Sequence, residues 1–313
     1  MAFIHDYKAC IILSILLLRS TRANLAYNEP LFYVSQPSRS TLRHLSSTSP
    51  EPEPDYLHEI PILYRGDHCL VVSKPPAVVV HHSGWTGSRA RAEVPILQRV
   101  RDQIGRRVNL VHRLDRGCSG CLLLTYADDP TTTAALVESM SNANKTYLAL
   151  VRGEGVLRGR DFQQEGWFEV DRRIADEKGD VKDARTLFLF VAGQDNQHGM
   201  LERPRASIVL AKPKTGRWHQ IRRHLNGLSH PILGDSTHGN SKENRQWKTR
   251  GMLSERTCLH LARFVLPPTA YTPDGLDVAC PVAPDMVRMV EQHLPDLLPS
   301  AKAVLDEEGV VWS

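Results

Sequence analysis

Short apolar runs, each bounded by glycine, proline or polar residues, recur from residue 60 onward and constrain the fold more than any other feature. Runs of this length between turn residues are typical of β-strands. Several lie close enough in the sequence to pair as hairpins, so we expect an α+β domain with a mixed, largely antiparallel sheet. The expected strands are residues 62–64, 69–73, 108–111, 121–125, 145–151, 167–170, 186–191, 207–210 and 259–266.

Fewer segments have the apolar spacing of a helix. Apolar side chains recur at helical spacing within residues 93–104, which predicts an amphipathic helix there. Pro130 suits the first turn of another helix. The expected helices, which should flank the sheet, are residues 93–104, 130–139, 219–225 and 284–293.

The length of 313 residues allows one large domain or two small ones, and a hydrophobic content of 41% is enough for a substantial core. No internal repeat is visible, and the predicted strands and helices follow one another without a second linker. We therefore expect one domain over residues 60–297, preceded by a leader and linker over residues 1–59 and followed by a C-terminal tail over residues 298–313.

The first 59 residues differ in composition from the rest. An apolar run at residues 10–18 follows Lys8; it is too short to span a bilayer but matches the apolar part of a signal peptide. Residues 36–49 are rich in Ser, Thr and Arg and lack acids, as organelle transit peptides do, and residues 47–55 predict a linker. We expect a plastid or mitochondrial protein with no membrane segment in its mature form. A disordered tail on a cytoplasmic protein is the alternative.

The net charge of +4 and the pI of about 8.7 describe a modest excess of base. Such a balance permits a nucleic-acid partner, but only clustering of the basic side chains on one face of the protein would indicate nucleic-acid binding. Basic side chains are dense at residues 101–116, 212–223 and 242–256, for which ordinary solvated surface is the alternative interpretation.

The six cysteines do not predict a disulfide framework. Cys69, Cys121 and Cys258 lie in apolar runs, where free cysteine behaves as a small buried hydrophobe. Zinc ligation by His112, Cys118 and Cys121 is conceivable, but no second Cys-x-x-Cys pair accompanies them and Cys121 begins a predicted buried strand. We therefore expect no metal site.

One acid, Asp115, lies among basic residues in a loop that leads directly into the apolar run at residues 121–125. Positive charge on Arg113 and Arg116 favours the ionised carboxylate. An ionised carboxylate in such a loop suits a nucleophile that acts on an anionic polymer. From spacing alone, a surface cluster of ion pairs remains the alternative.

Three blocks of sequence resemble the RluA-type pseudouridine synthases. His-Arg-Leu-Asp at residues 112–115, followed by Ser-Gly at residues 119–120, resembles motif II of that family, with Cys118 where the family usually has threonine. Lys-Thr-Tyr at residues 145–147 resembles the family's Lys-x-Tyr strand. Gly-Arg-Trp-His-Gln-Ile-Arg at residues 216–222 resembles its Gly-Arg-x-His-Gln-Ile-Arg block.

The resemblance covers residues 60–294, and within the family the chain is most similar to the TruC group, which acts on tRNA. The runs that carry this closer similarity are residues 62–64, 74–76, 101–105, 222–225, 230–235, 237–239 and 244–245.

The resemblance implies a pseudouridine synthase fold with an active-site cleft across the sheet. It implies isomerisation of uridine to pseudouridine in structured RNA, for which we expect tRNA, without cofactor or metal. Asp115 is the implied nucleophile or base. Arg222 is its implied partner, with Arg217 as a rival for that role, and Tyr147 is the implied stacking platform for the target base.

A paired uridine must leave its stem to reach a carboxylate, and Arg113 is implied to fill the gap. RNA is thus the expected partner, with no obligate protein partner. His219 and Gln220 are expected to contact RNA or to brace the helix of Arg222, and Lys145 to meet a phosphate or brace the site. The full set of expected RNA-binding residues is Arg113, Arg116, Lys145, Arg217, His219, Gln220 and Arg223.

Three other functions stay open at this point. One is a ribosomal RNA synthase of the same family, and another is an inactive RNA-binding protein that keeps the fold. The third is another carboxylate enzyme such as a glycoside hydrolase, which would need two paired acids. Asp235 is the best second acid, but residues 231–234 before it predict a structural turn.

Overall fold

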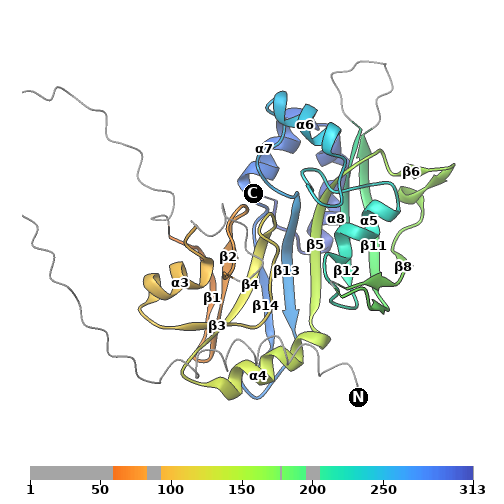
Figure 1. The fold of residues 1–313 in the computed structure, drawn as a ribbon. Helices are drawn as coiled ribbons and strands as arrows, with labels where there is room; N and C mark the ends of the chain where they lie inside the picture. Colours follow the sequence, from red (N-terminus) through yellow and green to blue (C-terminus); the bar gives the residue numbers. More distant parts are fainter. Residues whose placement is uncertain (1–58, 83–92, 177, 195–204, 313) are drawn as a thin grey trace, which may run out of the picture. The chain divides into compact units, whose positions relative to one another are not determined.

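A ten-stranded sheet forms the centre of the protein (Figure 1). The computed structural model describes residues 59–82, 93–176, 178–194 and 205–312, so the expected leader and linker, apart from residue 59, lie outside the described residues. The strands of the sheet are β1 (Ile62–Arg65), β2 (Cys69–Lys74), β3 (Val108–Leu110), β4 (Ser119–Tyr126), β5 (Asn144–Arg152), β8 (Phe168–Asp171), β11 (Arg185–Gln194), β12 (Ala206–Pro213), β13 (Leu259–Leu266) and β14 (Leu276–Ala279).

Neighbouring strands follow the order β1-β2-β4-β13-β5-β12-β11-β8, with β3 beside β4 and β14 beside β13. Among the described strands, only β4 and β13 pair in parallel, at Ser119 with His260 and Gly120 with Leu261. The predicted α+β class with a mixed, largely antiparallel sheet is confirmed. Two small hairpins lie outside the sheet, β6 (Val156–Leu157) with β7 (Arg160–Asp161) and β9 (Ile174–Ala175) with β10 (Val181–Lys182).

Helices surround the sheet. In Figure 1, α3 lies beside the β1 edge, α4 crosses the lower end of the strands, and α6 and α7 lie at the upper end. No helix in the described part of the chain is long and apolar enough to cross a membrane. The α-helices are α3 (Ile96–Ile104), α4 (Pro130–Ser139), α5 (Gln220–Gly227), α6 (Ser241–Thr249), α7 (Pro284–His293) and α8 (Leu297–Glu307), and the 3-10 turns are η2 (Met140–Asn142) and η3 (Phe162–Gln164).

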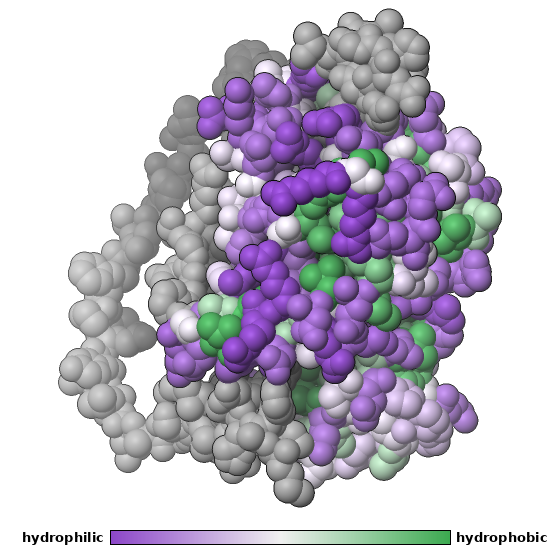
Figure 2. Space-filling view, turned by 90° about the vertical axis from the view of Figure 1, so that its right-hand side faces the viewer, coloured by the Kyte–Doolittle hydropathy of each residue, from purple (hydrophilic) through white to green (hydrophobic). Residues whose placement is uncertain are grey.

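Helices α5 and α8 cover opposite faces of β11 and β12. The Thr186 hydroxyl of β11 bonds to Gln220 of α5, so this face of the strand meets α5. Leu187 points to the other face because side chains alternate along a strand. Lys212 of β12 is the register partner of Leu187, so it lies on the same face. Its Nζ donates to Glu308 at the end of α8, which places α8 on this face. The face of the molecule on the β8 edge of the sheet, where β6 also lies, is mostly hydrophilic, with hydrophobic residues gathered down its middle (Figure 2).

The C-terminal segment belongs to this packed fold. Leu297, Ala301 and Leu305 recur every four positions on one side of α8, and each is at most 1% exposed. They pack into the core cluster that also holds α7 and β12. The expectation of a C-terminal tail over residues 298–313 is therefore wrong for the described residues to 312. The spacing of these three apolar residues is the signal that could have revealed the helix.

Two core clusters divide the sheet between them. One contains residues of β2, β3 and β4, and the other contains residues of β11 and β12. Tyr147 of β5 is half-buried and packs against both clusters. The junction between the two halves of the sheet therefore lies along β13 and β5, beside the parallel pairing of β4 with β13.

Gly120 makes that parallel pairing possible. Its φ is +114°, and an added Cβ would lie 2.3 Å from the Leu261 carbonyl oxygen and 2.5 Å from the Leu261 nitrogen. These are backbone atoms of the next strand and cannot rotate away. We expect Gly120→Ala to lower the free energy of unfolding by about 3 kcal/mol or more, since strain and overpacking add.

Gly159→Ala is the matched control for this substitution. Gly159 also has a positive φ, +82°, but nothing lies within 4 Å of the added Cβ. Urea unfolding of the two variants therefore separates the cost of the clash from the cost of the backbone conformation. Equal losses in both would contradict the role given to Gly120.

Candidate active site

Asp115 lies in the loop that leads into β4, and backbone hydrogen bonds hold this loop at two points. The Cys118 N–H donates to the Asp115 carbonyl at 3.0 Å, which closes a tight turn. The Thr257 N–H donates to the Gly117 carbonyl at 3.0 Å, which ties the loop to the segment before β13. The Cys118 side chain is 1% exposed and packs in the core, so cysteine in place of the family's usual threonine leaves the turn closed.

Lys74, the last residue of β2, holds the same loop from the interior. Its fully buried side-chain nitrogen donates to the carbonyls of Cys118 at 2.7 Å and Arg116 at 3.2 Å, and to the adjacent Pro75 at 2.8 Å. Burial lowers the pKa of Lys74 to about 7. Lys74 is not among the predicted site residues, although residues 74–76 belong to the runs that resemble the TruC group.

Lys74→Met is expected to lower kcat about 100-fold, because small shifts of a catalytic group carry costs of this size. Methionine has a similar length but cannot donate, so the Asp115 loop loses its interior anchors. The lost hydrogen bonds and the removed cost of burying an amine offset each other, so the free energy of unfolding should change little. Kinetics and urea unfolding test both parts, with exposed Lys302→Met as control. An unchanged kcat would contradict the anchoring role.

Arg222 of α5 bridges two carboxylates. Its Nη1 donates to Asp115 Oδ2 at 2.7 Å, and its Nε and Nη2 donate to the two oxygens of Asp235, each at 2.7 Å. The Arg222 side chain is only 6% exposed. Burial alone would lower its pKa, but the hydrogen bonds and charges of the two carboxylates raise it above the usual value. The pairing expected between Arg222 and Asp115 is thus present, and the bidentate pairing goes to Asp235.

Asp235 fixes the orientation of Arg222. It is 1% exposed, and its Oδ1 also accepts the N–H groups of Thr237 and His238, both at 2.9 Å. Burial raises its pKa, but the hydrogen bond and charge of Arg222 outweigh this, so the pKa of Asp235 lies below the usual value. Asp235 is therefore a buried positioning residue rather than a second reactive acid, which argues against a glycoside hydrolase.

Stability is expected to fall as the pH drops below about 4, the usual range of an aspartate in an unfolded chain. Because the folded pKa of Asp235 is depressed, its stabilising effect is complete above the unfolded pKa and is lost as the pH falls through the folded pKa. Asp235→Asn should therefore remove part of the acid dependence seen in urea unfolding. Identical pH dependence in Asp235→Asn and the parent would contradict this.

Gln220 is a brace and not an RNA contact. It is 4% exposed, its Oε1 accepts from Thr215 at 2.7 Å, and its Nε2 donates to the Arg185 carbonyl and Thr186 hydroxyl, both at 2.9 Å. The expectation that Gln220 binds RNA is wrong, because burial and these bonds use its amide. The alternative, that it braces the helix of Arg222, agrees with the structure.

Arg217 does not compete with Arg222 for Asp115. Its Nε donates to the Asp183 carbonyl at 2.9 Å, ahead of β11. Of the two arginines expected as partners of Asp115, Arg222 is therefore the one that contacts its carboxylate.

His219 lies between Asp115 and His238. Its Nε2 is 3.6 Å from Asp115 Oδ2, and its Nδ1 is 2.9 Å from His238 Nε2. Burial lowers the pKa of His219 to about 4, so the ring is neutral at neutral pH. The residue stands at the start of α5 with a φ of +53°, in the left-handed region. His219 thus forms one wall of the site.

Tyr147 of β5 lies in one row of the sheet with the end of the Asp115 loop. Gly120 pairs with Leu261, and Leu261 pairs in turn with Tyr147. The tyrosine is two strands away from the start of β4, half-buried between the core clusters. Its packing agrees with a core role, and its stacking role stays a prediction.

The two arginines that flank Asp115 differ in their surroundings. Both are exposed. Arg116 forms an ion pair with Glu93, so it is engaged at the surface of the protein. Arg113 contributes its charge beside the half-buried ring of His81, whose pKa is lowered by burial first and by this charge second.

Lys145 and Arg223 are partly engaged within the protein. Lys145 Nζ donates to the Met140 carbonyl at 3.1 Å, and burial lowers its pKa to about 8. This contact fits the bracing alternative better than a phosphate contact. Arg223 Nη1 donates to the Ala175 carbonyl of the β9–β10 hairpin at 2.6 Å, which leaves part of its guanidinium for other contacts.

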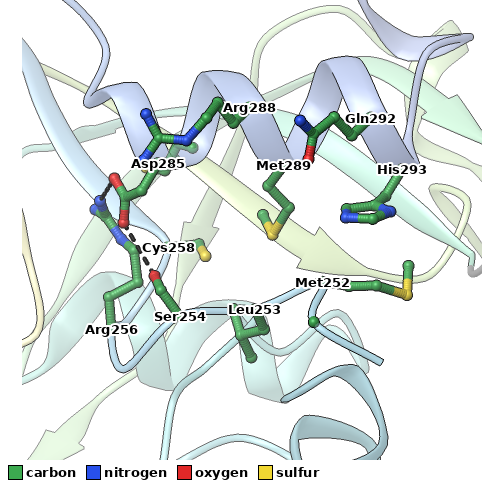
Figure 3. Close-up of a pocket in the computed structure, with 12 residues that line it drawn as sticks. Met252, Leu253, Ser254, Arg256, Cys258, Asp285, Arg288, Met289, Gln292 and His293 are labelled. Carbon is green, nitrogen blue, oxygen red and sulfur yellow. Dashed lines mark hydrogen bonds and ion pairs between the residues drawn. The ribbon is translucent and has the colours of Figure 1, made fainter. Parts of the chain in front are cut away.

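A cavity of about 150 Å³ lies between α7 and residues 251–258 (Figure 3). On its wall, Asp285 accepts from Arg256 at 2.8 Å and from Ser254 at 3.0 Å. Arg256 also donates to the Ser119 hydroxyl at 2.7 Å, so it links α7 to the first residue of β4. None of the predicted site residues lines this cavity, and we assign the active site to Asp115 instead.

Across the described residues, no three histidine, cysteine, aspartate or glutamate side chains lie together as a metal site. His112 Nε2 accepts the Leu123 N–H at 3.1 Å, and burial lowers the pKa of His112 to about 3. The imidazole therefore supports the backbone of β4, and the zinc alternative finds no ligand group in this part of the chain.

The arrangement leaves one reactive acid. The Asp115 side chain is 26% exposed, whereas that of Asp235 is 1% exposed. Arg222 and His219 both lie against Asp115 Oδ2, and the carboxylate as a whole keeps part of its surface exposed. A carboxylate oriented by a buried arginine can act as a nucleophile or as a base.

Known proteins share both the sequence and the fold. The family model for RNA pseudouridylate synthase matches residues 68–227, which include all three motif blocks. The tRNA pseudouridine synthase C of Yersinia pestis is 40% identical over 190 residues, covering 59% of this chain and 72% of that protein. The protein of the same name from Vibrio vulnificus (strain CMCP6) is 35% identical over 219 residues, covering 66% of this chain and 86% of that protein.

Two human structures have a similar fold. Human RNA Pseudouridylate Synthase Domain Containing 1 superposes with a TM-score of 0.55 at 22% identity, covering 74% of this chain and 86% of that one. Human RNA Pseudouridylate Synthase Domain Containing 4 superposes with a TM-score of 0.54 at 19% identity, covering 75% of this chain and 93% of that one. The expected pseudouridine synthase fold and the resemblance to the RluA-type enzymes are confirmed. The chain belongs to the RNA pseudouridylate synthase family and is an isomerase that acts on RNA.

Proposed function

We propose that this protein converts uridine to pseudouridine in tRNA, with Asp115 as the nucleophile or base. The observation that carries the proposal is the partly exposed Asp115 carboxylate, held through Oδ2 by the buried Arg222. The choice of tRNA rests on relatives named tRNA pseudouridine synthase C. A ribosomal RNA target is the alternative.

The reaction rearranges bonds without an external reactant. The bond from ribose C1′ to uracil N1 breaks, the base turns, and a bond from C1′ to C5 forms. The C5 proton is lost and N1 gains one, so the atoms balance without oxidant or reductant. In the proposed reaction the partly exposed Asp115 carboxylate attacks the sugar or the base, or removes a sugar proton.

Two further residues have proposed roles in handling the target base. A uridine in a stem must leave its stack at a cost of a few kcal/mol. Arg113 is proposed to fill the space that the base leaves; its exposure and its place two residues before Asp115 support this. Tyr147 is proposed to stack on the extruded base and to assist removal of the C5 proton.

The test compares unmodified transcripts of tRNA and of ribosomal RNA fragments, with the modified positions mapped by chemical probing. We expect pseudouridine in tRNA. Pseudouridine in ribosomal RNA alone would replace the proposed target with the alternative. Tight RNA binding with no pseudouridine in either substrate would favour an inactive RNA-binding protein.

We also propose that residues 1–59 direct the protein to a plastid or mitochondrion, a proposal that rests on their composition alone. Fusion of this segment to a fluorescent protein should send the fluorescence to one of these organelles. Diffuse cytoplasmic fluorescence would contradict the proposal without touching the catalytic assignment.

A further inference from the structure

Trp218 is a large exposed aromatic residue next to His219, which lies against the proposed catalytic acid. Its side chain is 39% exposed, although most large apolar residues of the described chain are buried. It precedes His219, whose Nε2 is 3.6 Å from Asp115 Oδ2. Exposure alone is ordinary for a single aromatic residue, but the contacts of Trp218 are specific.

The indole of Trp218 packs against two histidine rings. It stacks on the imidazole of His219 with ring centroids 4.0 Å apart and planes 23° apart. The His238 ring meets both of them edge-on, with centroids 6.0 Å from Trp218 and 5.1 Å from His219. The hydrogen-bond distance of 2.9 Å between the two histidines locks the group. One face of the indole is thus covered, while the side chain keeps a substantial exposed surface.

Positive charge lies next to this surface. The Arg223 guanidinium carbon is 5.9 Å from the centroid of the Trp218 ring, and its Nη1 is anchored on the Ala175 carbonyl. A planar apolar surface beside a fixed cation suits a nucleotide, whose base stacks while its phosphate meets the charge.

We propose that Trp218 is a stacking platform for an unpaired nucleotide adjacent to the uridine that Asp115 attacks. The inference rests on the proposed function and adds a second base-binding position to it. The imidazole of His219 separates the indole from the carboxylate, so a base on the indole belongs to a neighbouring nucleotide. The phosphate of that nucleotide lies toward Arg223.

The kinetic test uses the full chain and an unmodified tRNA transcript. Trp218→Ala should raise KM about ten-fold, the size of effect reported for base–aromatic stacking, with kcat within about three-fold of the parent. Trp218→Phe should restore most of the lost affinity, because it keeps a π-face. Tyr64→Ala is the matched control, an aromatic residue 36% exposed on β1 outside the site. A parent-like KM in Trp218→Ala overturns the proposal.

A second measurement does not depend on turnover. RNA binding should quench part of the intrinsic tryptophan fluorescence of the parent, and Trp218→Phe should lose that part. Retention of the full quench in Trp218→Phe overturns the platform. If the parent shows the Trp218 quench with RNA but forms no pseudouridine, the platform stands and the proposed function fails. A Trp218→Ala variant that changes only its oligomeric state would indicate a protein interface instead.

Discussion

Asp115→Asn is expected to lower pseudouridine formation at least about 1,000-fold, since loss of a nucleophile removes most of an enzyme's catalysis. The amide keeps the size of the carboxylate and can still accept from Arg222 Nη1, but it neither attacks carbon nor takes a proton at neutral pH. RNA affinity and the free energy of unfolding should stay close to the parent, because Asp115 is partly exposed. Nucleoside chromatography of digested RNA measures the product.

Asp128→Asn is the matched control. Asp128 pairs with Arg106 at the surface, beyond the other end of β4, and its side chain is 61% exposed. This variant should keep the parent's activity. Substantial product from Asp115→Asn would mean that another group carries the reaction.

Arg222→Lys is expected to lower kcat about 100-fold or more, because misplacement of a reacting group by about 1 Å has effects of that size. A lysine carries the charge but cannot donate in a fixed fork to two carboxylates at once. Either Asp115 loses its orientation or buried Asp235 loses a partner. Arg222→Ala goes further and leaves Asp235 buried and unpaired, which should reduce the free energy of unfolding by about 3–5 kcal/mol.

Arg263→Lys controls for the loss of a bidentate arginine. Arg263 pairs with Asp277 through two hydrogen bonds at 2.8 Å and 2.6 Å, but this pair is exposed. Exposed pairs contribute at most about 1 kcal/mol, so stability and kcat should change little. Similar losses in Arg222→Lys and Arg263→Lys would contradict the special role of the buried bridge.

The parts of the fold that local patterns determine could be predicted from the sequence. Apolar runs between turn residues identified the main strands because burial on both faces requires continuous apolar side chains. Helix α6 gave no such signal, since only Trp247 of its residues is buried. Strand β14 is short, and its pairing with β13 depends on a partner distant in the sequence.

The reactive acid and its arginine could also be predicted, but two of the residues that support them could not. Asp115 and Arg222 stand in recognisable motif blocks, and the structure brings them together at 2.7 Å. The sequence indicates no supporting role for Lys74 or Asp235, whereas bracing is one of the two roles expected for Gln220. Each is buried with its polar atoms bonded, a state that depends on segments far away in the chain.

The most direct test of the central claim is tritium release from RNA that carries label at uridine C5. The full chain is incubated with labelled total tRNA, without added cofactor or metal, beside Asp115→Asn. Release by the parent and none by the variant is the predicted result, because isomerisation must exchange the C5 hydrogen at the site of Asp115. No release from tRNA or ribosomal RNA, or equal release by both proteins, would contradict the account.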